Sequence, residues 1–490
     1  MRVLSAENIR KIEQKAFDSG ISYLTMMENA ATATVSAIVE RVEVKGKNVV
    51  VVAGAGNNGG DGYAVARLLE NEGAFVRVLS LFEPATETAK KQRERFGGQV
   101  CEFEPSYLYE ADIIVDAIFG IGLSRPLAGE GLQAVKTINS SSAYTVCIDI
   151  PSGLFADSGE EQICVKADLT VSFIAHKLCR VLHPAAENFG EVVLSDIGFN
   201  QSVYENVDAV GEIIPPPVIS KRKNNTHKGS YGTLSLVCGS FGMAGAALLS
   251  TSAALRCGVG IARLIIPESI YPAVTGFVPE AVCKAYDIKG DMKAVAESAV
   301  EGASAILLGC GLSTEEYAVN LFEEIIKTYS GRLIIDADGL NILARNIECI
   351  KSSQADIILT PHPGEMARLM GVSVGEIEKD RIGYAKALSD KYCCTVILKG
   401  NITVVASGGR VYFNLTGNPG MAKGGSGDIL AGMVAALSCT GMSSADSAVT
   451  AVYLHGAAGD RASLSLCETS MLPSDIISFL PELFKEFGEK

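Results

Sequence analysis

The sequence predicts an α/β protein made of two successive domains. Its 490 residues are more than the ~100–200 that one domain usually contains. Short apolar runs alternate with helix-like segments along most of the chain, as in folds with a parallel sheet. This alternation is interrupted once, near Gly211, and then restarts. We therefore expect one α/β domain before the interruption and a larger one after it.

The first domain begins with helix-like sequence. Ser5 is a suitable N-cap for a first helix, and a second helix is expected over residues 26–39. The apolar positions that define the buried face of the first helix are Ile9, Ile12, Ala16 and Phe17. Two helices are therefore expected before the first strand.

That first strand covers residues 48–54, an unbroken apolar run typical of a strand buried on both faces. A helix over 63–72, stopped by Gly73, is expected after it. Further strands are expected at 75–81, 99–103, 113–117 and 144–148. Together these elements predict a first domain over residues 1–211.

A linker over residues 212–228 is predicted by its polar, proline-rich and then basic sequence. Beyond it, strands are expected at 233–238, 260–266, 305–308, 333–336, 356–360, 395–398 and 403–405. From Gly427 onward the apolar residues recur at helical spacing, so successive helices should end the chain. The second domain is expected to cover residues 229–490.

Composition excludes several classes of protein. The net charge of −14 would repel a nucleic-acid backbone, so no nucleic acid is expected as a partner. No run of eighteen apolar residues occurs, so no membrane anchor is expected either. Thirteen cysteines without a C-x-x-C pair, in a chain that begins without a signal-peptide pattern, favour a cytoplasmic protein with reduced thiols.

A glycine-rich segment, residues 54–62, lies between the first expected strand of the sheet and the helix after it. Backbone amides at such a junction can approach a pyrophosphate at the positive end of the helix. A tight turn that needs glycine for backbone reasons would give the same pattern. The neighbouring Asn57, Asn58 and Asp61 exceed what a turn requires, and they favour ligand binding.

Carboxylates end two of the following strands. Asp116 lies at the end of one apolar run, and Asp149 ends the next, before Pro151 and Ser152. The carboxyl ends of parallel strands meet at one crevice, where ligands bind in open α/β sheets, although an Asp there can also cap a turn. We expect both side chains at one site.

These residues resemble the NAD(P)HX epimerase domain, through segments 28–30, 56–62 and 148–153 and through Asp116. The resemblance implies a Rossmann-like sheet and a potassium ion held by Asn58, Asp116 and Ser152. It also makes Asp149 the candidate proton-handling residue. The residues that it assigns to the hydrated dinucleotide are Asn57, Asn58, Gly59, Gly60, Asp61, Gly120, Ile121, Gly122, Leu123, Ser124, Arg125, Pro126 and Asp149.

A second glycine-rich segment, residues 417–428, precedes the apolar helix that starts near Ile429. Its glycines would let backbone amides surround a transferred phosphate, and Asp428 could take a proton from an attacking hydroxyl. The alternative is a simple loop, with Asp428 stabilising only the helix dipole, which is worth ~0.3–1 kcal/mol. Four glycines within the eight residues before one carboxylate favour the catalytic interpretation.

Two other polar segments follow strands of the second domain. His362 and Glu365 come after one strand, between prolines that restrict the backbone, and Asp336 and Asp338 end the strand before it. His362 alone is as well explained as an ordinary loop histidine. Its acidic neighbours favour a functional role for the segment.

The second half resembles the ADP- or ATP-dependent NAD(P)HX dehydratase, a ribokinase-like enzyme, in segments 225–229, 239–246, 309–312, 336–338, 360–366, 399–400 and 417–428. With the first half, nearly the whole chain is similar to the fused repair enzyme of prokaryotes. Cys310 stands where that family often has proline, and Lys423 where a small hydroxyl residue is common.

The resemblance implies repair of NADH or NADPH that has been hydrated at C6 of the nicotinamide ring. The first domain would interconvert the two epimers. The second would phosphorylate the C6 hydroxyl of the (S) epimer with Asp428 as base and then expel phosphate, converting ADP to AMP. Magnesium would accompany the nucleotide, and the protein is expected to be a homo-oligomer.

The resemblance assigns the dehydratase residues to two groups. Those facing the hydrated dinucleotide are Ala244, Gly311, His362, Pro363, Gly364, Glu365, Met366, Ala367, Arg368 and Asp428. Those contacting ADP are Lys399, Gly400, Asn401, Ile402, Thr403, Asn418, Pro419, Gly420, Met421, Ala422, Lys423, Gly424, Gly425, Ser426 and Gly427.

Three other hypotheses remain open from the sequence. The second domain could be a kinase for a vitamin or sugar alcohol, ending at a stable phosphorylated product. The first could bind a dinucleotide, or make the protein oligomerise, without catalysis. A conventional dehydrogenase is disfavoured, because it would leave Asn57, Asn58 and the second glycine-rich segment unused.

Overall fold

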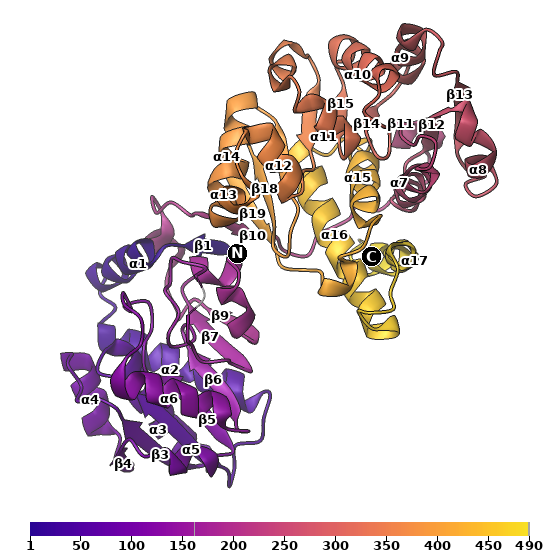
Figure 1. Ribbon diagram of the computed structural model, residues 1–490. Helices are drawn as coiled ribbons and strands as arrows, with labels where there is room; N and C mark the ends of the chain where they lie inside the picture. Colours follow the sequence, from indigo (N-terminus) through magenta and orange to yellow (C-terminus); the bar gives the residue numbers. More distant parts are fainter. Residues whose placement is uncertain (161, 489–490) are drawn as a thin grey trace. The chain divides into compact units, whose positions relative to one another are not determined.

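The computed structural model describes residues 1–160 and 162–488. The chain divides into two compact units, Met1–Glu212 and Ile213–Lys490, and each has the expected α/β architecture (Figure 1). No described helix is both long enough and apolar enough to cross a lipid bilayer.

The first unit is built on a parallel sheet with the strand order β4-β3-β2-β5-β6-β7-β9. Strand β2, in the interior of this sheet, is the predicted apolar run. The strands of the sheet are β2 (Asn48–Ala53), β3 (Phe75–Ser80), β4 (Gln99–Glu102), β5 (Ile113–Ala117), β6 (Tyr144–Ile148), β7 (Leu169–Phe173) and β9 (Glu191–Ser195). Three short strands, β1 (Arg2–Leu4), β8 (His176–Lys177) and β10 (Gly211–Ile213), lie outside it, with β1 pairing to both others.

Helices cover both faces of this sheet. Val49 and Val51 of β2 pack with α2 and α3, while Val50 and Val52 face α5 and α6. The helices are α1 (Ala6–Asp18), α2 (Tyr23–Val39), α3 (Asn57–Asn71), α4 (Glu87–Arg95), α5 (Ser106–Tyr109), α6 (Gly129–Ser140), and the short 3-10 helices η1 (Leu178–Val181), η2 (Ala185–Asn188) and η3 (Gln201–Tyr204). The valine run is therefore buried on both faces, as predicted.

Three expectations for the first unit were wrong. The short strand β1 precedes both early helices, because it pairs with β8 and β10, which lie far along the chain. Phe17 is not part of the buried face of α1: it is 45% exposed and stacks on Tyr23. Helix α3 begins at Asn57 rather than Tyr63, so most of the glycine-rich segment is the first part of the helix and not a loop.

The second unit contains the sheet order β13-β12-β11-β14-β15-β16-β17-β18-β19. Pairing is parallel from β13 to β17 and antiparallel from there to β19. The strands are β11 (Thr233–Val237), β12 (Ile261–Pro267), β13 (Val282–Tyr286), β14 (Ala305–Leu308), β15 (Arg332–Ile335), β16 (Asp356–Leu359), β17 (Thr395–Leu398), β18 (Thr403–Ser407) and β19 (Arg410–Asn414). The sequence did not predict β13 and β19; β13 is fully buried only at Tyr286 and contains Lys284, so it lacks an unbroken apolar run.

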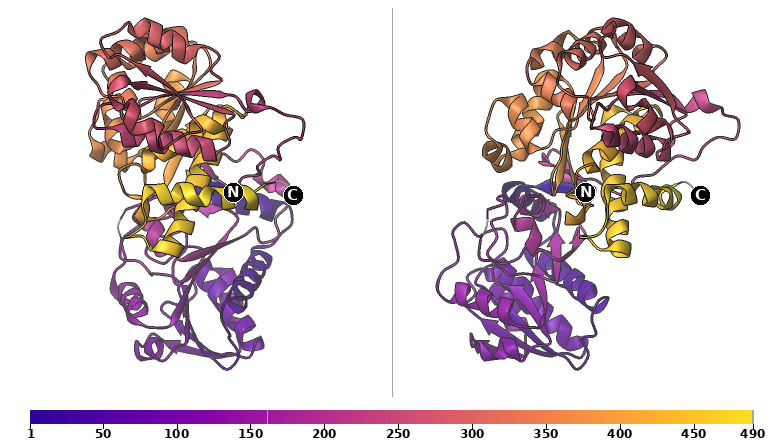
Figure 2. Two further views of the ribbon diagram at one scale, coloured as in Figure 1. Left: turned by 90° about the vertical axis from the view of Figure 1, so that its right-hand side faces the viewer. Right: turned by 45° about the vertical axis from the view of Figure 1, so that its right-hand side comes forward.

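One face of this sheet is covered by α7, α15, α16 and α17, whose apolar residues share a core with alternate residues of the strands. Helices α9 and α14 pack on the opposite face (Figure 2). Ser235 Oγ of β11 donates a hydrogen bond of 2.7 Å to the backbone oxygen of Ala299 in α9. The helices are η4 (Lys228–Tyr231), α7 (Ala244–Arg256), η5 (Glu268–Ile270), α8 (Tyr271–Thr275), α9 (Met292–Val300), α10 (Glu316–Thr328), α11 (Asp338–Leu343), η6 (Ile347–Ser352), α12 (Pro363–Met370), α13 (Val374–Lys379), α14 (Arg381–Tyr392), η7 (Pro419–Met421), α15 (Ser426–Ser438), α16 (Ser444–Leu466) and α17 (Pro473–Glu486).

Helix α15 lies unusually close to α7. A Cβ atom added at Gly432 of α15 would lie 2.2 Å from the backbone oxygen of Ser250 in α7, so only glycine fits there. The contact fixes the position of α15, which begins with Ser426, Gly427 and Asp428.

We predict that Gly432→Ala destabilises the second unit by about 1–3 kcal/mol, because the added methyl group must push two backbones apart. Chemical denaturation followed by circular dichroism measures this change. Gly245→Ala in α7 is the control, since a Cβ there meets nothing within 4 Å and should be tolerated. Equal stability of the two variants would contradict the close approach.

Candidate functional site

The first unit has a cavity of about 880 Å³ at the carboxyl ends of its strands. This volume lies within the ~300–1,000 Å³ usual for small-molecule sites. Its lining includes most of the residues expected to contact the dinucleotide: Asn57, Asn58, Asp61, Gly120, Ile121, Gly122, Leu123, Ser124, Arg125 and Asp149. Of the described residues in the same segments, Gly59, Gly60 and Pro126 lie outside the lining.

The glycines of the N-terminal segment allow close packing of α3. A Cβ at Gly59 would lie 2.0 Å from the backbone oxygen of Gly54, and one at Gly62 would lie 2.5 Å from the Ala117 methyl group. Helix α3 can therefore start directly against the ends of β2 and β5. Its first turn places the backbone amides of Asn57 and Asn58 at the cavity, where the helix dipole favours an anion.

Asp149 has a strained backbone at the wall of this cavity. Its φ of +71° lies in the left-handed region, which costs a non-glycine residue about 1–3 kcal/mol and is common at active sites. The conformation is held by hydrogen bonds from Asp149 N to Val171 O at 2.8 Å and from Ser172 Oγ to Asp149 O at 2.7 Å. It presents the carboxylate to Lys177, whose ammonium group forms an ion pair with it.

Lys177 is almost completely buried, at 1% exposure. Besides Asp149, its ammonium donates a hydrogen bond of 2.9 Å to the backbone oxygen of Phe173. The site therefore contains a fixed cation beside the candidate proton-handling carboxylate.

Two further carboxyl groups line the cavity. Burial and the neighbouring charge of Asp149 raise the pKa of Glu13 to about 7. Burial, Asp149 and Glu13 together raise the pKa of Asp61 well above its usual value. Close to neutral pH, the cavity can thus hold protonated and ionised carboxyl groups side by side.

Asp116 and Ser152, two of the three residues expected to hold potassium, form one buried hydrogen-bonded group behind the cavity. Ser152 Oγ donates to Asp116 Oδ1 at 2.6 Å and accepts from Phe119 N at 2.8 Å. Asp116 also accepts from Ser152 N, Cys147 Sγ and Ile118 N, so its four donors are all neutral. Burial raises the pKa of Asp116, although these hydrogen bonds oppose the shift.

Asn58, the third of these residues, is next to the same loop. A Cβ at Gly120 would lie 3.2 Å from Asn58 Oδ1, and Asn58 Nδ2 is buried without a hydrogen-bond partner. Because Gly120 directly follows Phe119, the Asn58 amide adjoins the group around Ser152.

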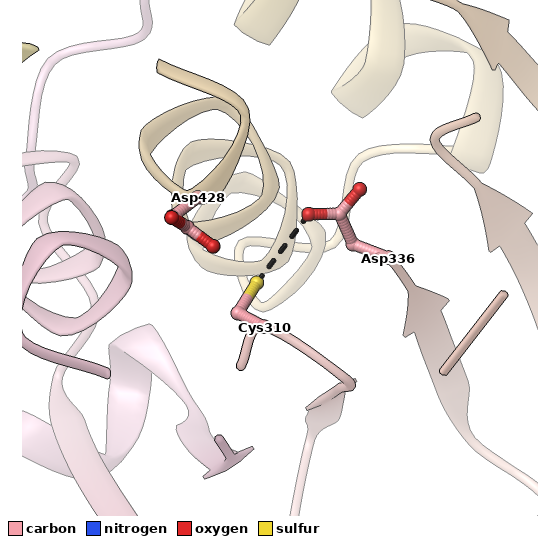
Figure 3. Close-up of side chains that lie close together, drawn as sticks. All are labelled: Cys310, Asp336 and Asp428. Carbon is pink, nitrogen blue, oxygen red and sulfur yellow. Dashed lines mark hydrogen bonds between the residues drawn. The ribbon is translucent and has the colours of Figure 1, made fainter. Parts of the chain in front are cut away.

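In the second unit, Asp428 lies in the first turn of α15 and points toward two other strand-end residues (Figure 3). One ligand atom from each of Cys310, Asp336 and Asp428 lies within 4.8 Å of the other two. Cys310 Sγ donates to Asp336 Oδ2 at 3.5 Å. Burial and the charge of Asp336 raise the pKa of Asp428 to about 6.

Asp336 is the centre of a buried polar network. Its Oδ1 accepts from Lys399 Nζ at 2.8 Å and from Thr360 Oγ1 at 2.6 Å. Burial alone would lower the pKa of Lys399, but Asp336 and Glu365 outweigh burial and raise it. Lys399 also adjoins the start of α15, since a Cβ at Gly427 would lie 3.4 Å from its ammonium nitrogen.

His362 is the N-cap of α12 in the structure. Its Nδ1 accepts from Gly364 N at 3.0 Å, and Glu365 Oε2 accepts from His362 N at 2.8 Å. Burial raises the pKa of Glu365 to about 7. Among the other residues expected to face the dinucleotide, Met366 and Ala367 have buried side chains, whereas Arg368 is exposed and bonds Asn341 at 2.8 Å.

Gly311 lies beside the start of α7. Its φ is +63°, and a Cβ there would lie 2.9 Å from Cβ of Met243, which directly precedes Ala244. The expected dinucleotide residues Gly311 and Ala244 are therefore neighbours, and Gly311 follows Cys310 of the Asp428 cluster.

The segment expected to contact ADP is held from several sides. Asp460 of α16 accepts from Gly417 N at 2.9 Å and from Asn418 Nδ2 at 3.0 Å, and Ser426 Oγ bonds the backbone oxygen of Met421 at 2.7 Å. Lys423 bonds the backbone oxygens of Thr469 and Met471. Lys423, at a position where the family commonly has a small hydroxyl residue, thus ties this segment to the residues just before α17.

Sequence reasoning missed several residues that line the first cavity, above all Glu13 and Lys177. Glu13 lies on an amphipathic helix, where a charged residue usually faces solvent. Lys177 could have been found, because it follows the carboxyl end of β7 by four residues. Asp149 and Lys177 are 28 residues apart in the sequence, so no local pattern indicates that they form an ion pair.

Two family models match the chain. "YjeF-related protein N-terminus" matches residues 24–179, and "NAD(P)H-hydrate dehydratase" matches residues 234–482. Each match falls within one of the two units and covers its site residues Asp149 or Asp428.

Similar proteins extend this result over the whole length. A bifunctional NAD(P)H-hydrate repair enzyme of Thermofilum pendens is 34% identical, over 100% of this chain and 97% of its own. One of Escherichia coli is 33% identical, over 98% and 93%. The crystal structure of an ADP/ATP-dependent NAD(P)H-hydrate dehydratase from Bacillus subtilis, co-crystallised with ATP and Mg²⁺, is 33% identical with a TM-score of 0.50, covering 55% of this chain and 95% of that one. The chain therefore belongs to the family of bifunctional NAD(P)H-hydrate repair enzymes.

Proposed function

We propose that this chain repairs hydrated NADH and NADPH with two active sites, one in each unit. Residues 1–211 form the epimerase, which interconverts the (R) and (S) forms, and residues 229–490 form the dehydratase, with 212–228 as a linker. The dehydratase converts the (S) form to NAD(P)H at the expense of ADP. The position of Asp428, at the start of α15 beside Lys399 and Asp336, is the observation that carries the assignment of phosphoryl transfer.

Asp428 is suited to act as the base of the dehydratase. With a pKa of about 6 it is ionised at neutral pH, yet it binds a proton more readily than an exposed carboxylate. It removes the proton from the C6 hydroxyl as that oxygen attacks the terminal phosphate of ADP. The C6–O bond of the resulting phosphate ester then breaks with the ring nitrogen supplying electrons, and inorganic phosphate leaves. Loss of a proton from C5 restores the reduced nicotinamide.

The chain can stabilise the transferred phosphate from two directions. The backbone amides of Gly425, Ser426 and Gly427 form the N-terminus of α15, and the Lys399 ammonium adjoins Gly427. The carboxylates of Asp336 and Asp428 suit magnesium, which would neutralise phosphate charge when bound. The thiol of Cys310 is a soft ligand and does not suit it.

Asn58, Asp116 and Ser152 fit a potassium ion in the epimerase unit. Asp116 is a buried carboxylate with only neutral donors, so a nearby monovalent cation would stabilise its charge. Rotation of the unpartnered Asn58 amide would present its oxygen, and Ser152 adds a hydroxyl. Potassium held there would fix the loop that contains Gly120, which lines the cavity.

The cellular setting is a separate part of the proposal. We place the enzyme in the cytoplasm as a homo-oligomer, and both statements stay predictions. All thirteen cysteines lie in the described part of the chain as free thiols, which agrees with a reducing compartment.

The central test follows the return of reduced-nicotinamide absorbance from hydrated NADH that contains both epimers, with ADP, magnesium and potassium. The wild type should restore all of it. The Asp149→Asn variant should restore only the fraction that is present as the (S) epimer, because it does not interconvert the epimers. Asp428→Asn should lower kcat of dehydration by about 10²–10⁴-fold, the usual contribution of a general base.

Asp446→Asn is the matched control, because Asp446 also lies in the first turn of a helix but is exposed and distant in sequence from the site. Its activity should equal the wild type. A stable phosphorylated small molecule formed without return of NADH would instead support the kinase hypothesis. Parallel reactions with ATP measure the nucleotide preference.

Dehydration should depend on pH through Asp428. As pH falls below about 6, the base becomes protonated, so kcat should fall about tenfold per pH unit. Steady-state rates at saturating ADP give this profile. A rate that stays level well below pH 6 would contradict the role of Asp428.

Potassium should stabilise the first unit. Replacing it by tetramethylammonium, which is too large for the site, should lower the temperature of thermal unfolding and slow epimerisation. Asn58→Ala should abolish the difference between the two cations, whereas Asn71→Ala, at the exposed end of the same helix, should retain it. A wild type indifferent to the cation would contradict this site.

A further inference from the structure

The cavity of the first unit contains one acidic group that neither sequence motif nor family resemblance assigns. Glu13 comes from α1, before the first strand of the sheet, and its side chain lines the cavity together with Asp149 and Lys177. It is half-buried. Within the part of the chain that the structure describes, no hydrogen bond or ion pair of its carboxyl group is recorded, which leaves the group available to a ligand.

We propose that Glu13 is the acid partner of Asp149 in epimerisation. Each carboxyl group transfers one proton: Asp149 exchanges it with the oxygen on C6, and Glu13 exchanges it with N1. This inference rests on the proposed epimerase function of the same cavity. It concerns how that site works and adds a catalytic residue to it.

The two groups differ in the way that acid–base catalysis requires. Asp149 forms an ion pair with the buried ammonium of Lys177. Glu13 has no such bonded cation, and burial together with the charge of Asp149 raises its pKa to about 7. One group is thus ready to accept a proton while the other still carries one.

The hydrated nicotinamide is a cyclic hemiaminal, which can invert by opening and closing its ring. The Asp149 carboxylate removes the proton of the C6 hydroxyl, C6 and its oxygen form an aldehyde, and the C6–N1 electron pair goes to N1. Glu13 donates its proton to N1. Rotation about the C5–C6 bond followed by the reverse steps closes the ring on the other face, and both carboxyl groups return to their starting states.

Asp61 is a weaker candidate for the acid. It belongs to the glycine-rich start of α3, next to residues expected to hold the dinucleotide, and its position is tied to the first turns of that helix. Glu13 approaches from a different element. The charged and titratable groups that face Glu13 are Arg10 on α1, Tyr23 on α2, Asp61 on α3, Asp149 after β6 and Lys177 on β8.

The experiment uses the full chain carrying Asp428→Asn, so that the dehydratase does not consume the substrate. Purified (R) epimer is added with potassium, and chromatography follows the appearance of the (S) epimer. Adding Glu13→Gln should lower kcat by about 10²-fold or more, with KM nearly unchanged, because Gln keeps the shape but carries no transferable proton. Glu7→Gln, on the exposed face of the same helix, should have no effect.

The pH profile separates catalysis from a structural role. In the parent, kcat should fall as pH rises above about 7, since Glu13 then loses its proton. The residual rate of Glu13→Gln should lack this decline, and Glu13→Asp should retain it at an intermediate rate. If the Gln variant fails to fold, the presence or absence of the decline in the Asp variant decides the same point.

Three outcomes would overturn the inference. The Gln variant could be as fast as its parent, its alkaline decline could persist, or reactions in water labelled with heavy oxygen could place one label on C6 per inversion. The last result would mean that the C6–O bond breaks instead of C6–N1. A parent that does not epimerise at all would instead overturn the proposed function of the unit.

Discussion

The structure depends on carboxylates buried at the carboxyl ends of parallel strands. A buried charge is costly unless hydrogen bonds or an opposite charge compensate it. Asp116 is compensated by four neutral donors, Asp149 by Lys177, and Asp336 by Lys399 and Thr360. These partners come from loops and strands distant in sequence, so each carboxylate ties several segments to one edge of a sheet.

The two units compensate a buried carboxylate in related ways. In each, a lysine from a later part of the chain forms an ion pair with an aspartate at a strand end, and a glycine-rich helix start lies nearby. The ammonium group of the lysine thereby compensates the buried aspartate. Among the described residues, no cation is bonded directly to the neighbouring carboxyl groups of Glu13 and Asp428, and their pKa values are raised to about 7 and about 6.

Sequence patterns predicted several of the fully buried strands but missed β7, which is buried at every position. The runs that became β2, β5 and β14 are apolar at nearly every position, because both faces of each sheet are covered. The predicted start of α3 was wrong because glycine propensity indicates a loop. The decisive factor is instead the close approach of Gly59 to the backbone of Gly54. Glu13 could not be predicted as a site residue, since it reaches the cavity only through tertiary packing.

In the proposed dehydratase, the position of Lys399 between Asp336 and the start of α15 would link phosphate binding to proton transfer. The ammonium group stabilises the negative charge of Asp336, and Asp336 in turn raises the proton affinity of Asp428. A phosphate that draws the ammonium away from Asp336 leaves more uncompensated negative charge beside Asp428. Binding of the nucleotide would then raise the proton affinity of Asp428 when the phosphate that the substrate hydroxyl attacks is present.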